Sequence, residues 1–241
     1  ILQNSQSYSV GADGSVRHDG IARPAEPKSY AHLFGGKLTV SGKNRRKELA
    51  EFLQFETGSK TLPASATLVA SAPANACGEV TRVPVNAWVL VDRGGCSFHD
   101  KLRNAAAAGA GGVLIVNDMP GLVHGKGIPS GTTVDSDDGT HTPAAMVTLS
   151  FGRTLRTQVG LPAVVQFKSD PHVVRRWNAL AELETNSAWP EDKSERKALY
   201  KALSMQNHPD KDGGNADRFS YLQMLYQAVD GGNDIRREGL V

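Results

Sequence analysis

The sequence predicts an α+β fold in which a mixed domain of strands and helices is followed by a small all-α domain. Short apolar runs rich in β-branched residues, separated by Gly and Pro, occur from about residue 30 to residue 168. Helical spacing of apolar residues dominates after Asp170-Pro171. A chain of 241 residues is long enough for two domains of ordinary size. We therefore expect a tail at 1–29, the mixed domain at 30–170 and the helical domain at 171–241.

Residues 1–29 are expected to form an extended tail. Ser, Gly and Pro recur through this segment, and only scattered apolar residues could dock on a core. The chain opens with Ile1 and has no apolar run of the kind a signal peptide needs. The expectation is that any targeting peptide has been removed or was never included.

The mixed domain is predicted to hold short strands and two helices. Ser97 can cap a helix that stops at Gly109, with Asp100 in its first turn. A second helix is expected at 150–159. The expected strands span residues 37–40, 66–70, 87–91, 112–117, 144–149 and 163–168.

The segment 121–142 is predicted to be a long surface loop with an acidic cluster. Asp135, Asp137, Asp138 and His141 could offer ligands to calcium, but they lack the spacing of an EF-hand loop. A solvated acidic loop is the favoured interpretation. The sequence contains no Gly-x-Ser-x-Gly elbow and no phosphate-binding loop. We therefore expect a protein without a metal or cofactor that is not an enzyme.

The helical domain is predicted to contain helices at 172–185, 192–207 and 215–229. The middle helix carries Leu199 and Leu203 on one face. Lys193, Lys197 and Lys201 follow one another at intervals of four residues on another face. One face is therefore expected to pack and the other to be basic.

Charge and hydropathy exclude two classes of partner. The chain has 27 basic and 25 acidic residues, a net charge of +2, with no basic stripe suited to a phosphate backbone. Its longest apolar run, at 112–116, is far shorter than a membrane span. Neither nucleic acid nor a membrane span is expected.

The chain has two cysteines, Cys77 and Cys96. Their spacing fits neither a zinc ribbon nor a C-x-x-C redox pair, which leaves a disulfide or two buried thiols. Because both flank a predicted strand and could lie across neighbouring strands, the disulfide is favoured, and with it an oxidising compartment.

Residues 89–118, VLVDRGGCSFHDKLRNAAAAGAGGVLIVND, closely resemble the central signature of the protease-associated (PA) domain. The upstream segment ANACG at 74–78 and the downstream segment TPAAMVTLSFGRTL at 142–155 are similar to further elements of the family. The resemblance implies a PA-type β-sheet or open barrel with flanking helices. It also implies that Cys77 and Cys96 form a disulfide, and that the domain is a non-catalytic module that binds a protein.

Residues 195–230, ERKALYKALSMQNHPDKDGGNADRFSYLQMLYQAVD, resemble the J domain of the DnaJ co-chaperones. The resemblance places Tyr200, Leu203 and Met205 in the core of its second helix. It assigns chaperone binding to five residues: Lys197, Lys201, His208, Pro209 and Asp210.

Together the two resemblances imply a non-enzymatic, co-chaperone-like protein. The J domain would recruit a lumenal seventy-kilodalton heat-shock chaperone while the PA domain binds a protein partner. The alternative is a structural or adaptor subunit of an extracellular or organellar homo- or hetero-assembly, with both domains as interaction surfaces. Both interpretations place the protein in the lumen of the secretory pathway or outside the cell.

Overall fold

The computed structural model describes residues 8–10, 16–18, 21–22, 35–42, 47–54, 62–122, 142–159, 161–184 and 188–231. The chain divides into two compact units. One unit is His32–Val174, and the other combines Ile1–Ala31 with Arg175–Val241. The acidic cluster at 135–141 lies outside the described residues.

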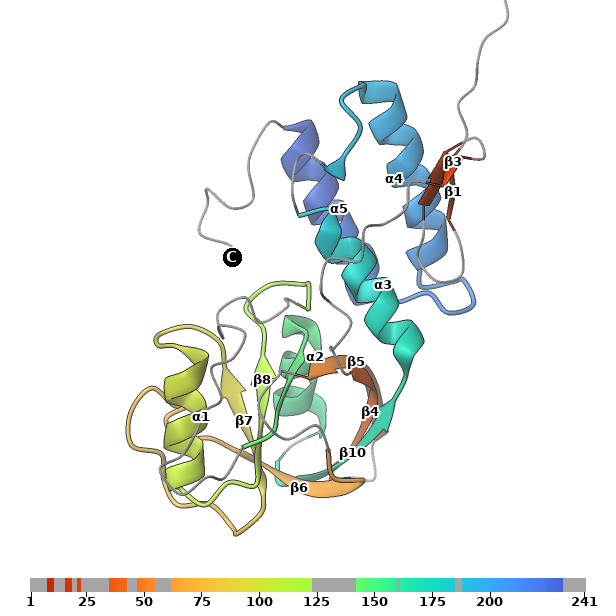
Figure 1. Cartoon of the computed structure of the whole chain (residues 1–241). Coiled ribbons are helices and arrows are strands. Elements are labelled where there is room, and N and C mark those ends of the chain that lie inside the picture. Colours follow the sequence, from red (N-terminus) through yellow and green to blue (C-terminus); the bar gives the residue numbers. More distant parts are fainter. Residues whose placement is uncertain are drawn as a thin grey trace, which may run out of the picture. The chain divides into compact units, whose positions relative to one another are not determined.

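The first unit is built on a closed β-barrel (Figure 1). Around the barrel the strands follow the order β10-β4-β5-β9-β8-β7-β6, and β10 pairs with both β4 and β6 to close it. The expected barrel with flanking helices is therefore confirmed, except that the barrel is closed rather than open. The strands are β4 (Gly35–Ser41), β5 (Lys47–Gln54), β6 (Ser65–Ala70), β7 (Trp88–Asp92), β8 (Gly112–Val116), β9 (Ala144–Val147) and β10 (Ala163–Ser169).

The barrel combines parallel and antiparallel pairing. Strands β6 to β9 run parallel to one another, whereas β4, β5 and β10 join the barrel by antiparallel pairs. Every residue of β8 and β9 is buried. Continuous apolar strands of this kind are typical of parallel sheets that are covered on both faces. Apolar side chains fill the barrel interior, among them Leu38, Phe52, Trp88 and Leu114.

Two helices cover the parallel part of the barrel. Helix α1 (Phe98–Ala107) and helix α2 (Leu149–Thr154) each contact β8. Ser97 caps α1 as predicted, since its side chain accepts the backbone N–H of Asp100. The helix expected at 150–159 changes character part-way, because α2 continues as the π-helix η1 (Leu155–Val159).

Strand β5 was not predicted from the sequence. Its residues KELAEFLQ are good helix formers and include no β-branched side chain. In the structure β5 pairs with β4 from Lys47 to Leu53 and with β9 at its far end. Pairing on both sides therefore outweighs the local helical preference.

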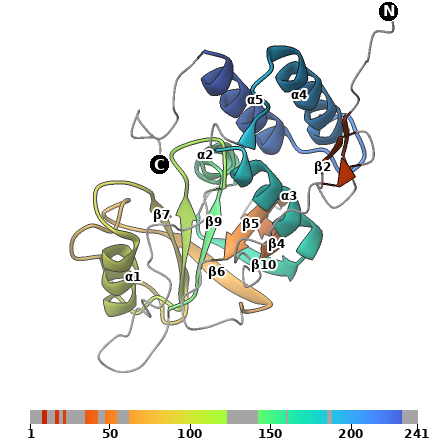
Figure 2. The ribbon, with the colours of Figure 1, turned by 45° about the horizontal axis from the view of Figure 1, so that its top comes forward.

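The described residues of the second unit form three helices and a small sheet. Helix α3 (Pro171–Glu182) leads into it, and α4 (Lys193–Asn207) lies beside α5 (Ala216–Asp230), as Figure 2 shows. Trp177, Tyr221 and Leu222 lie in its core and are almost fully buried. The N-terminal strands β1 (Tyr8–Val10), β2 (Val16–His18) and β3 (Ile21–Ala22) form an antiparallel sheet, and β1 contacts α4.

This sheet corrects two expectations. Residues 1–29 do not form only an extended tail, because their strands pair with one another and belong to the helical unit. Because the sheet belongs to this unit, the unit is not the all-α domain that was expected. Segments that indicated only weak docking in the sequence thus form short paired strands.

Candidate functional site

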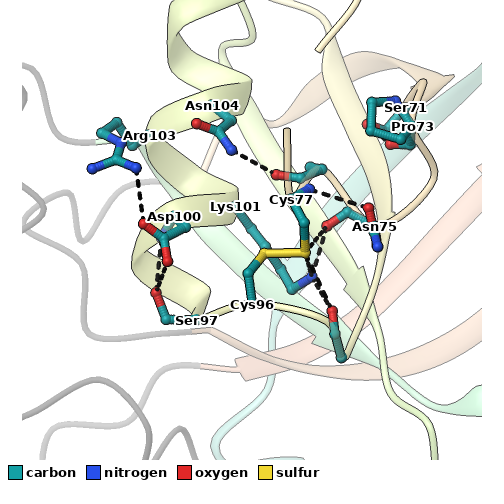
Figure 3. The surroundings of a disulfide bond; sticks show 12 residues. Ser71, Pro73, Asn75, Cys77, Cys96, Ser97, Asp100, Lys101, Arg103 and Asn104 are labelled. Atoms are coloured by element: carbon teal, nitrogen blue, oxygen red, sulfur yellow. Dashed lines mark hydrogen bonds and ion pairs between the residues drawn. A yellow bond between two sulfur atoms is a disulfide. The ribbon is translucent and has the colours of Figure 1, made fainter. Parts of the chain in front are cut away.

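A disulfide joins the segment after β6 to the start of α1 (Figure 3). The sulfur atoms of Cys77 and Cys96 are bonded, and their Cα atoms lie 5.6 Å apart. Both residues are partly exposed. We call the disulfide, Lys101 and the loop 75–77 the disulfide corner.

Lys101 is fully buried beneath this disulfide. Its ammonium donates to the carbonyl oxygens of Asn75 and Gly94, each at 2.6 Å, and to Cys77 Sγ at 3.3 Å. Burial lowers the pKa of Lys101, while the charges of Asp92 and Asp100 act in the opposite direction. The three N–H groups of the ammonium thus have three acceptors, none of which is a carboxylate.

The loop that carries Cys77 has further bonds to hold it. The Asn104 side-chain amide donates to the carbonyl of Ala76 at 2.9 Å, and the backbone N–H of Cys77 donates to Asn75 Oδ1 at 3.1 Å. Lys101 and Asn104 lie one turn apart on α1, so this helix holds the loop through bonds that do not involve the disulfide.

The other charged groups near the start of α1 are already paired. Asp100 accepts from Ser97 Oγ at 2.7 Å and from Arg103 at 2.9 Å. The hydrogen bond from Ser97 is the main cause that lowers the pKa of Asp100. Asp92 accepts from Arg156 at 2.5 Å.

A groove lies along α4 and the following loop in the second unit. It has a volume of about 580 Å³. Three lysines and three apolar or aromatic side chains contribute most of its lining. The lining residues are Lys197, Tyr200, Lys201, Ser204, Met205, His208, Asp210, Lys211 and Phe219.

The structure brings four of the five residues assigned to chaperone binding into this groove. His208 ends α4, and its ring packs edge-on against Phe219 with centroids 5.2 Å apart. The backbone N–H of Asp210 donates to His208 Nδ1 at 3.3 Å. Pro209 follows His208 and is exposed, but it does not line the groove. Met205 was expected in the core, whereas 60% of it is exposed.

Two buried or partly buried arginines hold the loop after α4, and sequence reasoning missed both. Arg176 of α3 donates to the Gly213 carbonyl at 2.7 Å, and Arg218 of α5 donates to the same oxygen at 2.6 Å. Gly213 has a φ of +71°, a conformation that favours glycine. The arginines therefore fix the turn that follows His208 and Asp210.

The described residues contain no group of three or more His, Cys, Asp or Glu side chains that could hold a metal ion. The acidic cluster of Asp135, Asp137, Asp138 and His141 lies outside those residues. Within the same described ranges, no helix combines the length and apolar character that crossing a membrane requires.

Comparison with known proteins identifies part of the chain. The family model of the PA domain matches residues 64–155. The chain is 27% identical over 212 residues to the "Probable lipoprotein aminopeptidase LpqL" of Mycobacterium tuberculosis, a match that covers 86% of this chain and 40% of that protein. It is 34% identical over 87 residues to "Leucine aminopeptidase 2" of Trichophyton rubrum, covering 36% of this chain and 14% of that protein.

A third relative is not named as an enzyme. The chain is 35% identical over 74 residues to "Vacuolar-sorting receptor 2" of Arabidopsis thaliana, a match that covers 30% of this chain and 12% of that protein. The chain thus spans less than half the length of each of these three relatives.

The comparisons overturn the expected function. The prediction of a non-enzymatic co-chaperone, with its adaptor alternative, is wrong because the longest of these matches is to an aminopeptidase and a second is to another aminopeptidase. They also give no support for a J domain after the PA segment. The PA resemblance, in contrast, is confirmed: residues 64–155 of this chain are a PA domain.

Proposed function

We propose that the protein itself removes residues from the amino termini of peptides, with the PA domain as the accessory part of that activity. One observation carries the proposal. The match to the mycobacterial aminopeptidase extends over 212 residues, more than twice the length of the PA segment at 64–155. The likeness to a peptidase therefore extends beyond the PA segment.

The PA barrel would serve this activity through its surface. Apolar side chains such as Leu90 and Leu114 fill its interior, and the barrel is closed. A peptide would therefore bind to the loops and helices around the barrel rather than inside it.

The proposal is tested by incubating the purified full chain with a panel of synthetic peptides that differ in their first residue. We expect the peptides to lose their amino-terminal residues one at a time, and mass spectrometry measures this loss. The same peptides with acetylated amino termini are the matched control and should remain intact. The activity must co-purify with the chain in constant ratio through two chromatographic steps. Failure to shorten any free peptide, or equal cleavage of the acetylated ones, would overturn the proposal.

We further propose that the groove along α4 binds an acidic segment of a protein partner or substrate that carries an apolar side chain. Lys197, Lys201 and Lys211 supply positive charge around the groove. The exposed Met205 and the Phe219 ring supply apolar contact between those charges. Such a surface complements a segment rich in Asp and Glu, and the charges favour fast, salt-sensitive association.

Fluorescence anisotropy with a labelled peptide of alternating Leu and Glu tests the groove. Substitution of Lys197 and Lys201 by Glu should weaken binding by about tenfold or more, because two attractions become repulsions. A Lys47→Glu/Lys168→Glu variant makes the same change of charge on the barrel and should bind like the wild type. Equal loss in both variants would show that net charge alone attracts the peptide, and the groove would have no role.

The disulfide supports a location in an oxidising compartment, such as the secretory lumen or the cell exterior. We propose this location together with the peptidase-related function. Labelling of thiols in protein taken from its native source tests it, since two free thiols would contradict the placement.

A further inference from the structure

We propose that Cys77 is a thiol-exchange site: once its bond to Cys96 is reduced, Lys101 holds its sulfur as a thiolate that reacts with low-molecular-weight disulfides. This inference is independent of the peptidase-related function. It rests on the geometry of the disulfide corner (Figure 3).

The first support is the position of a buried positive charge. Lys101 Nζ lies 3.3 Å from Cys77 Sγ and is fully buried. Its other two N–H groups are occupied by the carbonyls of Asn75 and Gly94, which carry no net charge. A Cys77 thiolate would therefore be the first anion in direct contact with this ammonium. Adjacent cations are known to favour the thiolate form of cysteine.

The nearby carboxylates of Asp92 and Asp100 do not contact the Lys101 ammonium in place of the Cys77 sulfur. Asp92 is paired with Arg156, and Asp100 is bound to Ser97 and Arg103. In Figure 3 the Asp100 carboxylate lies beside Ser97 and Arg103, away from the Lys101 ammonium. These two carboxylates act on Lys101 through space and help to keep it charged.

The two sulfurs are not equivalent. Lys101 bonds to the sulfur of Cys77, while Cys96 lies one residue before the α1 cap, next to the Ser97–Asp100 pair. The negative charge of Asp100 disfavours a thiolate at Cys96. Reduction should therefore produce a thiolate at Cys77 and a thiol at Cys96.

The loop geometry makes the chemistry reversible. Lys101 and Asn104 bind the carbonyls of Asn75 and Ala76, and these bonds do not depend on the disulfide. Cys77 therefore stays near Cys96 after reduction. Its partial exposure gives a small reagent access to the sulfur.

The proposed steps balance as ordinary thiol–disulfide exchange. A dithiol reduces the Cys77–Cys96 bond and becomes a disulfide itself. The Cys77 thiolate then attacks a low-molecular-weight disulfide, forms a mixed disulfide and releases one thiolate. Cys96, on losing its proton, attacks the Cys77 sulfur, restores the original bond and releases the second thiolate.

The test measures alkylation of the reduced full chain by iodoacetamide as a function of pH, resolved for each cysteine by mass spectrometry. Each rate is divided by its own plateau at high pH, so that differences in access cancel. The midpoint of the Cys77 profile should lie about one pH unit or more below that of Cys96, giving about tenfold more thiolate near neutral pH. Incubation with oxidised glutathione should then place the mixed disulfide on Cys77 in a Cys96→Ser variant.

Lys101→Met is the decisive variant, and Arg103→Met on the same helix is its control. Arg103 is exposed and does not contact the sulfur. Only Lys101→Met should move the Cys77 midpoint upward, toward that of Cys96. If Lys101→Met fails to fold, as judged by circular dichroism, the wild-type comparison of the two cysteines still decides. Coincident profiles for Cys77 and Cys96, or a Cys77 profile unchanged in folded Lys101→Met, would overturn the proposal.

Discussion

At the scale of single residues, the close packing of β8 on β7 makes a sharp prediction about Gly112. A Cβ atom at this position would lie 2.2 Å from the Trp88 ring, far inside van der Waals contact. Gly112→Ala should therefore lower the free energy of unfolding by about 1–3 kcal/mol, the usual cost of overpacking. Urea denaturation followed by circular dichroism measures the change.

Gly78→Ala is the matched control for this substitution. A Cβ atom at Gly78 would meet nothing within 4 Å. This variant should unfold within about 0.5 kcal/mol of the wild type. Equal stability of the two variants would show that β7 and β8 do not approach as described.

Lys101 also shows how much of a residue's environment can be predicted from the sequence. The PA signature includes it, but a lysine in an amphipathic helix ordinarily points its charge to solvent. Its burial depends on the carbonyls of Asn75, which is 26 residues away in the sequence, and of Gly94 in the turn before the helix. Motif recognition finds such a residue, whereas its partners require the folded chain.

At the scale of elements, substitutions can test whether residues 47–54 form the strand β5 or the helix that their sequence pattern suggests. Leu49, Phe52 and Leu53 have the spacing of one helical face. In the structure 65% of Leu49 is exposed and only 1% of Phe52, whose ring packs 5.3 Å from that of Phe167. Phe52→Ala should cost about 3–5 kcal/mol of stability, and Leu49→Ala less than about 0.5 kcal/mol. Comparable losses in urea denaturation would favour a helix instead.

The start of α4 gives a prediction about pH. Asp192 caps this helix, and hydrogen bonds, above all from Ser194, lower its pKa from the ordinary value of 3.8. Because the folded pKa is depressed, the ionised cap stabilises the protein at pH values above 3.8 and loses this effect as the pH falls through the lower folded value. The difference in unfolding free energy between wild type and Asp192→Asn should therefore be constant at neutral pH and shrink in acid. A difference that grows in acid would contradict this assignment.

Elements differ in how well their sequences predicted them. The strands β7 and β8 and helix α1 follow from apolar runs, a capping serine and glycine stops, which are local signals. Closure of the barrel by β10 and the addition of β5 depend on pairing between distant segments, so local patterns do not contain them. The groove shows the same division: the basic spacing of Lys197 and Lys201 was visible, but the exposure of Met205 and the arginine-held turn at Gly213 were not.

At the scale of the whole molecule, the disulfide should stabilise only one of the two units. Cys77 and Cys96 are separated by 19 residues in the barrel unit. Cross-links of this loop length contribute about 3 kcal/mol, mainly by restricting the unfolded chain. A Cys77→Ser/Cys96→Ser variant should therefore unfold its barrel at lower urea, while the helical unit keeps its midpoint.

Tryptophan fluorescence can separate the two units. Trp88 reports on the barrel, and Trp177 and Trp189 report on the helical unit. The protein with the disulfide and the variant without it are each prepared in two forms. Trp88→Phe leaves only the signal of the helical unit, and Trp177→Phe/Trp189→Phe leaves only the signal of the barrel. An equal shift of both transitions would contradict separate units, and no shift in the Trp88 signal would contradict the predicted role of the disulfide.

The position of β10 has a consequence for the order in which the chain is made. Strands β4 and β6 have no common neighbour until residues 163–169 pair with both. During synthesis, therefore, the chain must leave the ribosome as far as β10 before the barrel can close. Until β10 pairs with them, the edges of β4 and β6 are open to pairing with other chains. A nascent chain that pauses before residue 163 would be most exposed to aggregation, and the same holds for a fragment limited to the PA segment at 64–155.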